Sequence, residues 1–180
     1  SEEQVLIRNA TRDWVNKHVK PNIEKYFQKA ETPSYLIKEL ASIGAFGLII
    51  PEKYGGSGLG YHKYVAIVEE ISKIDPSIGL SIAAHNSLCT GHIFYFGNED
   101  QKSKWLPKLS SGKYLGAWGL TENNTGSDAA RMNTTAVKDG DYYIINGSKN
   151  FITHGLSGDL AVVVARTGEI GDSHGISAFI

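Results

Sequence analysis

The sequence predicts an α+β protein with two parts, an all-α helical domain over residues 1–113 and an antiparallel β-barrel domain over residues 114–180. Apolar residues recur at helical spacing through the first part. The second part instead holds short segments rich in β-branched and aromatic residues, separated by glycine-containing turns. With 41% hydrophobic and 21% charged residues, the 180-residue chain has the composition of a folded globular protein.

Composition and charge exclude several classes of function. Eighteen basic and nineteen acidic residues give a net charge of -1, so no overall field favours nucleic acid or an anionic membrane. Cys89 is the single cysteine, which excludes an intrachain disulfide and fits a reducing compartment. The uncharged stretch 77–97 is too polar for a membrane span. We expect a bacterial cytoplasmic protein, or a mitochondrial matrix protein if a transit peptide was removed.

The first two helices are marked by their end signals. Ser1 and Gln4 have capping-box spacing, and the helix that they open is interrupted at Pro21. Thr32 is the expected N-cap of a second helix, with Pro33 in its first turn.

A glycine-rich loop over residues 52–60 follows the second helix. It could cradle a phosphate, but its spacing fits neither the dinucleotide fingerprint nor the lysine-containing phosphate loop. Plain turn geometry is therefore favoured. A third helix is expected over residues 64–74, closed by Asp75-Pro76.

The fourth helix, over residues 77–96, lacks a charged face and should lie centrally in the helical layer. His85 and His92 would share a face of it, but the sequence supplies no further metal ligands, which favours core or pocket-wall histidines. Cys89 between them is favoured as a small buried hydrophobe over a nucleophile. A short capped helix over residues 98–107 completes the domain.

Beyond residue 115 the pattern changes to strands and hairpins. Five strands are expected, at residues 134–137, 142–145, 150–153, 160–165 and 176–180. They predict an antiparallel meander or barrel. Because five short strands make a poor closed domain, we expect the native chain to continue past residue 180.

The stretch 115–131 concentrates hydroxyls, amides, carboxylates and glycines at this change of architecture, which is typical of a ligand site. Trp118 and Phe151 are aromatic residues near Thr121 and Thr153, on separate expected strands. A flat, redox-active ring needs an apolar face and hydrogen-bond donors along its edge. Residues 151 and 153 of one strand could supply both, since positions i and i+2 share a side. The alternative is ordinary sheet packing.

The segment 125–128 offers a second polar group. Gly126 permits close approach of a ligand and Ser127 can donate to a phosphate or pyrophosphate, although an Asx-type turn around Asp128 explains the same residues. Glu122 and Asp128 could also be read as an acid–base pair, but nothing in the sequence indicates that they converge.

Several ordered motifs together resemble the acyl-CoA dehydrogenase family of flavoproteins. They are Gly119-Leu120-Thr121-Glu122, Gly126-Ser127-Asp128, Asn146-Gly147-Ser148-Lys149 and Phe151-Ile152-Thr153-His154-Gly155, supported by Pro51 to Gly58, Gly97 to Gln101 and Trp105-Leu106-Pro107. The resemblance spans nearly the whole chain. It implies a helical first domain, a middle β-barrel domain, and a final four-helix bundle that this chain lacks.

The resemblance also implies bound FAD. The cofactor-binding residues would be Trp118, Gly119, Leu120, Thr121, Glu122, Ser127, Phe151, Ile152 and Thr153. Of these, Ser127 would reach the FAD pyrophosphate or the CoA part of the substrate.

The activity implied by the resemblance is α,β-dehydrogenation of an acyl-CoA thioester. Electrons would pass to an electron-transfer flavoprotein, and the protein would be a homotetramer. The family's base lies in the final domain, so no catalytic residue is assigned in this chain, and Glu122 is not assigned that role. The alternatives are an acyl-CoA oxidase or flavin-dependent monooxygenase on the same fold, or a non-enzymatic module that has lost the flavin.

Overall fold

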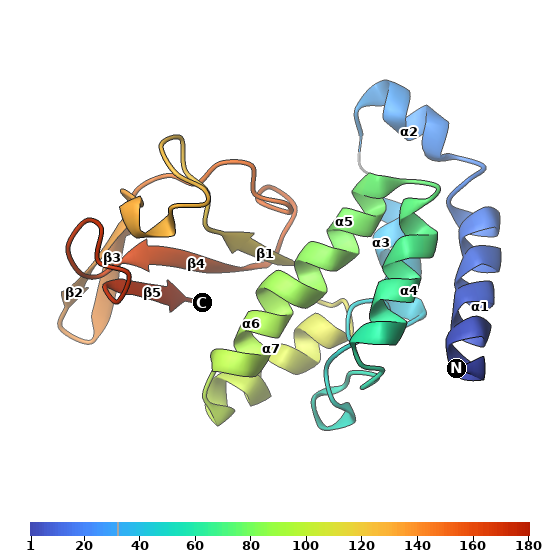
Figure 1. The fold of residues 1–180 in the computed structure, drawn as a ribbon, viewed down its shortest axis with the longest axis horizontal. Coiled ribbons are helices and arrows are strands. Elements are labelled where there is room, and N and C mark those ends of the chain that lie inside the picture. Colours follow the sequence, from blue (N-terminus) through green and yellow to red (C-terminus); the bar gives the residue numbers. More distant parts are fainter. Residues whose placement is uncertain (32) are drawn as a thin grey trace. The chain divides into compact units, whose positions relative to one another are not determined.

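The computed structural model describes residues 1–31 and 33–180, which form two compact units, Ser1–Tyr114 and Leu115–Ile180 (Figure 1). The first unit contains α1 (Glu2–His18), α2 (Ile23–Lys29), α3 (Ser34–Ser42), η1 (Glu52–Tyr54), α4 (Tyr61–Ser72), α5 (Pro76–Ala83), η2 (Ala84–Thr90), α6 (Gly91–Phe96) and α7 (Glu99–Ser110). The second contains β1 (Gly116–Gly119), η3 (Ala129–Arg131), β2 (Thr135–Asp139), β3 (Tyr142–Asn146), β4 (Leu160–Arg166) and β5 (Ile176–Phe179). A helical unit followed by a sheet unit is confirmed.

Two helix starts have the predicted capping boxes. At α1, the Ser1 hydroxyl accepts from the Gln4 amide and the Gln4 side chain accepts from the Ser1 amine. The start of α7 repeats this arrangement with Asn98 and Gln101. These bonds satisfy amides that have no partner within the helix, so local sequence is enough to fix the start.

Other helix ends differ from the prediction. The expected N-cap Thr32 lies outside the described residues, and Pro33 stands at the N-cap position of α3 rather than in its first turn. The short helix α2 was not predicted. Pro107 lies inside α7, and the helix continues to Ser110 because Leu109 extends its buried face.

The predicted central helix is present from Pro76 to Phe96 as the successive elements α5, η2 and α6 (Figure 1). The middle element, η2, is a π-helical segment. Asp75 begins the central helix, because its carboxylate accepts from the Ile78 amide at 2.8 Å. The π segment carries Asn86, whose buried amide group donates to the carbonyls of residues 45 and 82 and accepts from the amide of residue 48. Asn86 therefore ties the helix to the connection that follows α3.

His85 and Cys89 are buried in this helix. The His85 Nε2 lies 3.2 Å from the carbonyl of Leu109, and its ring packs edge-on against Phe46. His92 is half-buried beside Phe96, and burial lowers its pKa. No His, Cys, Asp or Glu cluster able to hold a metal occurs among the described residues. The core interpretation of His85 is confirmed.

The glycine-rich loop after η1 is a packed turn. The amides of residues 57, 58 and 59 donate to the carbonyls of residues 47, 50 and 48, so the loop folds back on the preceding segment. A β carbon on Gly56 would lie 2.0 Å from the Ile50 carbonyl oxygen, which leaves glycine as the residue that fits. The backbone amides of residues 55–59 all donate to carbonyls of residues 47–52, in agreement with the interpretation of this loop as a turn.

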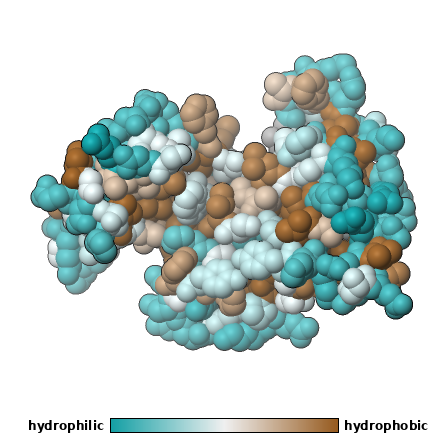
Figure 2. Space-filling model, viewed as in Figure 1, coloured by the Kyte–Doolittle hydropathy of each residue, from teal (hydrophilic) through white to brown (hydrophobic). Residues whose placement is uncertain are grey.

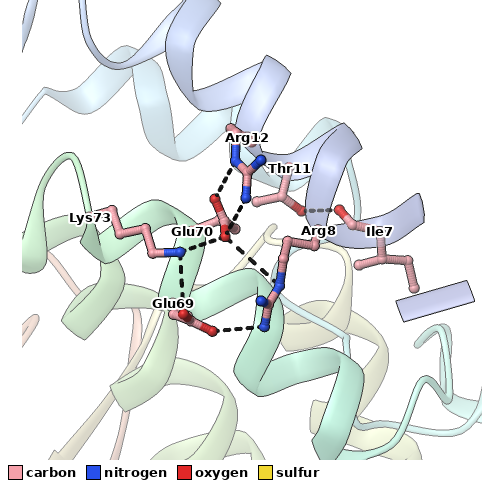
Figure 3. Close-up of polar contacts among 7 residues, drawn as sticks. All are labelled: Ile7, Arg8, Thr11, Arg12, Glu69, Glu70 and Lys73. Atoms are coloured by element: carbon pink, nitrogen blue, oxygen red, sulfur yellow. Dashed lines mark hydrogen bonds and ion pairs between the residues drawn. The ribbon is translucent and has the colours of Figure 1, made fainter. Parts of the chain in front are cut away.

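A cluster of charges joins α1 to α4 (Figure 3). The Glu70 side chain is only 2% exposed, and its oxygens accept from Arg12 at 2.9 and 3.1 Å and from Lys73 at 2.7 Å. Arg8 pairs with the more exposed Glu69 at 2.9 Å. The hydrogen bonds from Arg12 and Lys73 lower the pKa of Glu70 from 4.5 to about 2. Glu70 is thus the buried anion on which cations of both helices meet.

We predict that Glu70→Gln lowers the free energy of unfolding by about 1–2 kcal/mol at pH 7, because charge-assisted bonds to partly exposed cations are lost. The control Glu69→Gln removes a carboxylate with 45% exposure and should change it by less than about 0.5 kcal/mol. Since the folded pKa lies below 4.5, the Glu70 contribution is present above pH 4.5 and is lost as the pH falls toward 2. Urea unfolding followed by circular dichroism measures both variants, and equal losses would contradict the prediction.

The sheet has the order β1-β4-β2-β3, with β5 also paired to β4. β1 and β4 are parallel, with Gly116 opposite Leu160, and β2 meets β4 in parallel at Thr135 and Arg166. The antiparallel meander is therefore wrong for these pairs, because period-two alternation does not distinguish parallel from antiparallel neighbours. The pairs β2–β3 and β4–β5 are antiparallel as predicted. The sheet is not closed over the described residues, and the barrel stays a prediction.

Two further strand assignments are corrected. The expected strand at residues 150–153 is irregular backbone that enters a turn at residue 153, and β1 lies outside the five strand ranges expected above. The β1 sequence Gly-Ala-Trp-Gly has little β propensity, so its strand conformation depends on pairing with β4.

The interior of the sheet unit is formed by Met132, Ala136, Val162 and Ala165, all buried. Val137 of β2 and Ile144 of β3 remain exposed at 62% and 55%. Apolar side chains are visible among hydrophilic ones on the surface of this unit (Figure 2). None of the described helices is both long and apolar enough to cross a membrane.

Candidate cofactor-binding site

The predicted site begins on β1, whose start is fixed by Asp159. The Asp159 carboxylate accepts from the Leu115 amide at 2.8 Å, and its own amide donates to the Leu115 carbonyl at 2.8 Å. Side chains alternate along the strand, so Trp118 projects to one face while Ala117 and Gly119 project to the other. The Trp118 Nε1 is buried without a hydrogen-bond partner among the described residues.

Glu122 follows β1 and carries a buried carboxylate, 4% exposed. Its Oε2 accepts from the Asn133 amide at 2.6 Å, while Oε1 accepts from the Thr134 amide at 3.0 Å and from Lys149 Nζ at 2.8 Å. Burial favours the neutral form, but the bonds from Lys149 and the two amides outweigh it and bring the pKa of Glu122 to about 2. A carboxylate so fully engaged is an ionised structural group and cannot serve as a general base near neutral pH.

Lys149 is the cation of this network, and its side chain is only 10% exposed. Besides Glu122, its ammonium donates to the Leu120 carbonyl at 2.9 Å and lies 4.0 Å from the Met132 sulfur. Gly119 faces the lysine stem, since a β carbon there would lie 3.4 Å from Lys149 Cγ. At that distance a β carbon would make ordinary van der Waals contact, so the lysine stem packs directly against β1 at Gly119.

Asn150, the next residue, also attaches this loop to the segment that follows β1. The Asn150 amide donates to the Thr121 carbonyl at 2.8 Å, and the Asn150 side chain also donates to the Asn123 side chain. These bonds bring the segments of Thr121 and Phe151 side by side. Phe151 itself has φ 57° and is 94% exposed. A left-handed backbone under a bulky, exposed aromatic ring costs about 1 kcal/mol or more, and such strain concentrates at ligand sites.

His154 fastens the other end of this loop. Its Nδ1 lies 2.9 Å from the Gly116 carbonyl, so Nδ1 carries the proton that is donated. Burial lowers the pKa of His154, partly opposed by this bond. The Gly158 amide in turn donates to the His154 carbonyl at 2.7 Å. Residues 149–154 therefore run along β1 in the opposite direction, attached beyond its end and at its start.

An open hollow of about 670 Å³ lies in the sheet unit. Its lining includes Ala117 and Gly119 of β1, Ala161 and Val163 of β4, and loop residues Lys149, Ile152 and His154. By strand alternation this is the face of β1 opposite Trp118. The hollow therefore contains Gly119 and Ile152 of the predicted set.

The predicted residues thus fall into groups. Residues 118–122 and 151–153 lie on adjoining segments, with Thr121 and Thr153 half-buried. Ser127 lies on an exposed turn in which Thr125 donates to the Asp128 carbonyl and the amide of Glu122 donates to Thr125. Since residues 151–153 are irregular backbone and not a strand, the argument that strand alternation puts Phe151 and Thr153 on one side does not apply.

Sequence reasoning gave no role to Lys149, Asn150, His154 or Asp159. Three of them stand in or beside the motifs that carried the family resemblance, but their roles depend on partners far along the chain. The sequence offered one signal for Lys149, its position two residues before the Phe151-Ile152-Thr153 motif. That position does not reveal which groups the lysine contacts.

We predict that Glu122→Gln lowers the free energy of unfolding by about 3 kcal/mol at pH 7, because it leaves the Lys149 ammonium buried without its anion. The folded pKa of Glu122 is below 4.5, so the advantage of the native carboxylate is constant above pH 4.5 and shrinks below it. It should fall by about 1 kcal/mol between pH 5.5 and 3.5. Chemical unfolding at both pH values measures it, with the exposed Glu169→Gln as control; a difference that does not change with pH would contradict the assignment.

The chain thus consists of a helical unit followed by a sheet unit, in which an exposed aromatic residue, Phe151, is attached beside the segment that follows β1. The model of the acyl-CoA dehydrogenase N-terminal domain matches residues 1–113, and that of the acyl-CoA dehydrogenase middle domain matches residues 117–180. The chain belongs to the acyl-CoA dehydrogenase family, whose members are flavoprotein oxidoreductases, typically homotetrameric.

Individual relatives agree with this assignment. An acyl-CoA dehydrogenase of Bacillus subtilis (strain 168) is 43% identical over 180 residues, which are 100% of this chain and 48% of that protein. The structure of butyryl-CoA dehydrogenase from Megasphaera elsdenii has a TM-score of 0.93 and 39% identity, covering 99% of this chain and 48% of that one. A glutaryl-CoA dehydrogenase from Mycobacterium smegmatis, in complex with FADH2, has a TM-score of 0.92 and 35% identity, covering 99% and 45%. The chain spans about half the length of these relatives.

Proposed function

We propose that these residues belong to an FAD-dependent acyl-CoA dehydrogenase, which converts an acyl-CoA thioester to the trans-2-enoyl-CoA and passes electrons to an electron-transfer flavoprotein. The observation that supports this most directly is Phe151, a strained and almost fully exposed aromatic residue fastened beside the end of β1. An exposed ring held in a costly conformation is expected where a ligand covers it.

The residues present fit a flavin. Trp118 and Phe151 offer aromatic faces, and Trp118 also has a buried N–H that finds no partner in the part of the chain that the structure describes. Thr121 and Thr153 offer half-buried hydroxyls for the polar edge of the ring, and the exposed Ser127 hydroxyl suits a pyrophosphate. The remaining proposed contacts come from the backbone of Gly119, Leu120 and Ile152.

When bound, FAD supplies acceptance of a hydride from the substrate. The role of this chain is to orient the ring and keep its surroundings dry. The Glu122 side chain and amide are both engaged within the sheet unit, so we assign Glu122 a supporting part. No residue of the chain is proposed as the catalytic base.

The proposal also covers the domain organisation, oligomeric state and location of the whole protein. The sheet unit would be the middle domain, closed into a barrel by further chain and followed by a four-helix domain, with a domain boundary near residue 113. We propose a homotetramer in the bacterial cytoplasm, or in the mitochondrial matrix if a transit peptide is removed. An acyl-CoA oxidase or flavin monooxygenase on this fold would differ in the fate of the reduced flavin, and a non-enzymatic module would lack it.

We predict that the full-length protein is yellow as purified or becomes so with FAD, and that an acyl-CoA bleaches its absorbance under anaerobic conditions. A panel of acyl-CoAs of different chain length tests reaction and substrate together. Rapid reoxidation by oxygen during turnover would favour the oxidase alternative. A protein that remains colourless after incubation with FAD would contradict the proposal.

We predict that Thr153→Val weakens FAD binding by roughly tenfold or shifts the reduction potential of the flavin, because a hydrogen bond to the ring edge is lost without a change of shape. Thr135→Val in β2 is the matched control. FAD titration and a spectroelectrochemical measurement give both values. Results equal to those of the native protein would remove Thr153 from the site.

A further inference from the structure

The loop 149–154 is attached to β1 at both ends through bonds that local sequence does not reveal. Lys149 Nζ donates to the Leu120 carbonyl and the Asn150 amide donates to the Thr121 carbonyl, both just after β1. His154 reaches the Gly116 carbonyl at the start of β1. Residues 151–153, which carry the strained turn, lie between these attachments.

The attachment at Lys149 is buried and charged. Its ammonium has two oxygen partners, the Leu120 carbonyl and Glu122 Oε1, at 2.9 and 2.8 Å. Glu122 is held in turn by the amides of residues 133 and 134, so three separate segments meet at one ion pair. A buried ion pair adds little net stability compared with apolar packing, but it specifies one arrangement of the groups around it. Here the arrangement specified is that of the two segments proposed to hold the flavin.

A strained residue persists only where its surroundings determine its conformation. Phe151 comes directly after the two residues that bond to Leu120 and Thr121. The left-handed residue is therefore held on its preceding side by the Lys149 ammonium and the Asn150 amide, and His154 holds the following side.

We propose that Lys149 is a positioning residue for the cofactor site, which acts through Leu120 and Glu122 to fix the 151–153 turn against the end of β1. The part that concerns flavin rests on the function proposed above. By this proposal, Lys149 contacts neither the reacting atoms nor the flavin ring. It sets the distance between the two segments, residues 118–122 and 151–153, that are proposed to contact the flavin.

The variant Lys149→Met removes the ammonium and keeps an unbranched side chain of similar length. It also leaves Glu122 buried without its cation, so Lys149→Met/Glu122→Gln removes both charges and separates loss of position from loss of stability. Lys138→Met changes an exposed lysine of the same unit and is the matched control.

Hydrogen exchange of the Asn150 and Gly155 backbone amides, which donate to the Thr121 and Ile152 carbonyls, tests whether Lys149 positions the turn; it is measured on the full-length protein without added FAD. Exchange should accelerate roughly tenfold or more in Lys149→Met and in the double variant, and stay unchanged in Lys138→Met. If the double variant folds with native stability and native exchange at these amides, Lys149 does not position the turn.

FAD titration of the same proteins tests the consequence for the site. The dissociation constant should rise roughly tenfold or more in both Lys149 variants, with a shift of the bound-flavin absorbance, while the control matches the native protein. Native affinity and spectrum in the double variant would overturn the role toward flavin. A native protein that binds no FAD would instead overturn the proposed function. Hydrogen exchange would still show whether Lys149 positions the turn.

Discussion

The sheet unit depends on one buried carboxylate. Glu122 is ionised in an environment that disfavours charge, and three donors from two separate parts of the chain have to converge on it. That requirement sets the position of the 133–134 backbone before β2 and of Lys149 after β3. Both faces of the candidate site, the end of β1 and the turn at Phe151, follow from where these donors are held.

The helical unit uses the same physical solution at Glu70, with one difference. The cations around Glu70 are partly exposed, so solvent screens their attraction to the carboxylate. Glu70 links the surfaces of two helices. The lysine that meets Glu122 is itself buried, and it also bonds a main-chain carbonyl. The first arrangement joins preformed helices, whereas the second determines the course of irregular backbone.

Much of the helical unit could be predicted from sequence, because the signals are local. The capping boxes at Ser1 and Asn98 are complete within four residues, and the uncharged central helix needs no knowledge of its partners. The π segment at Asn86 could not be predicted, since its side chain bonds to the connection after α3, far away in the sequence.

For the candidate site, sequence could predict which two segments adjoin but not their geometry. The motifs around Thr121 and Phe151 identified two segments that do adjoin. Conformation was assigned from β propensity, which favoured a strand at residues 150–153 and overlooked β1, whose glycines and alanine pair only because β4 lies alongside. Lys149 was overlooked for a related reason, because a lysine is ordinarily exposed and its burial is a property of the assembled unit.

The parallel pairing of β1 with β4 also bears on how the chain folds. The two strands are separated by the whole β2–β3 hairpin and the 149–154 loop, so their contact closes a long loop and depends on distant chain. Contacts of that kind form slowly, and the helical unit also contains one of them, the packing of α1 against α4. During synthesis the helices emerge first, and β1 leaves the ribosome without its partner. The strand on which the candidate site is built therefore finds its pairing partner only after β4 has been synthesised.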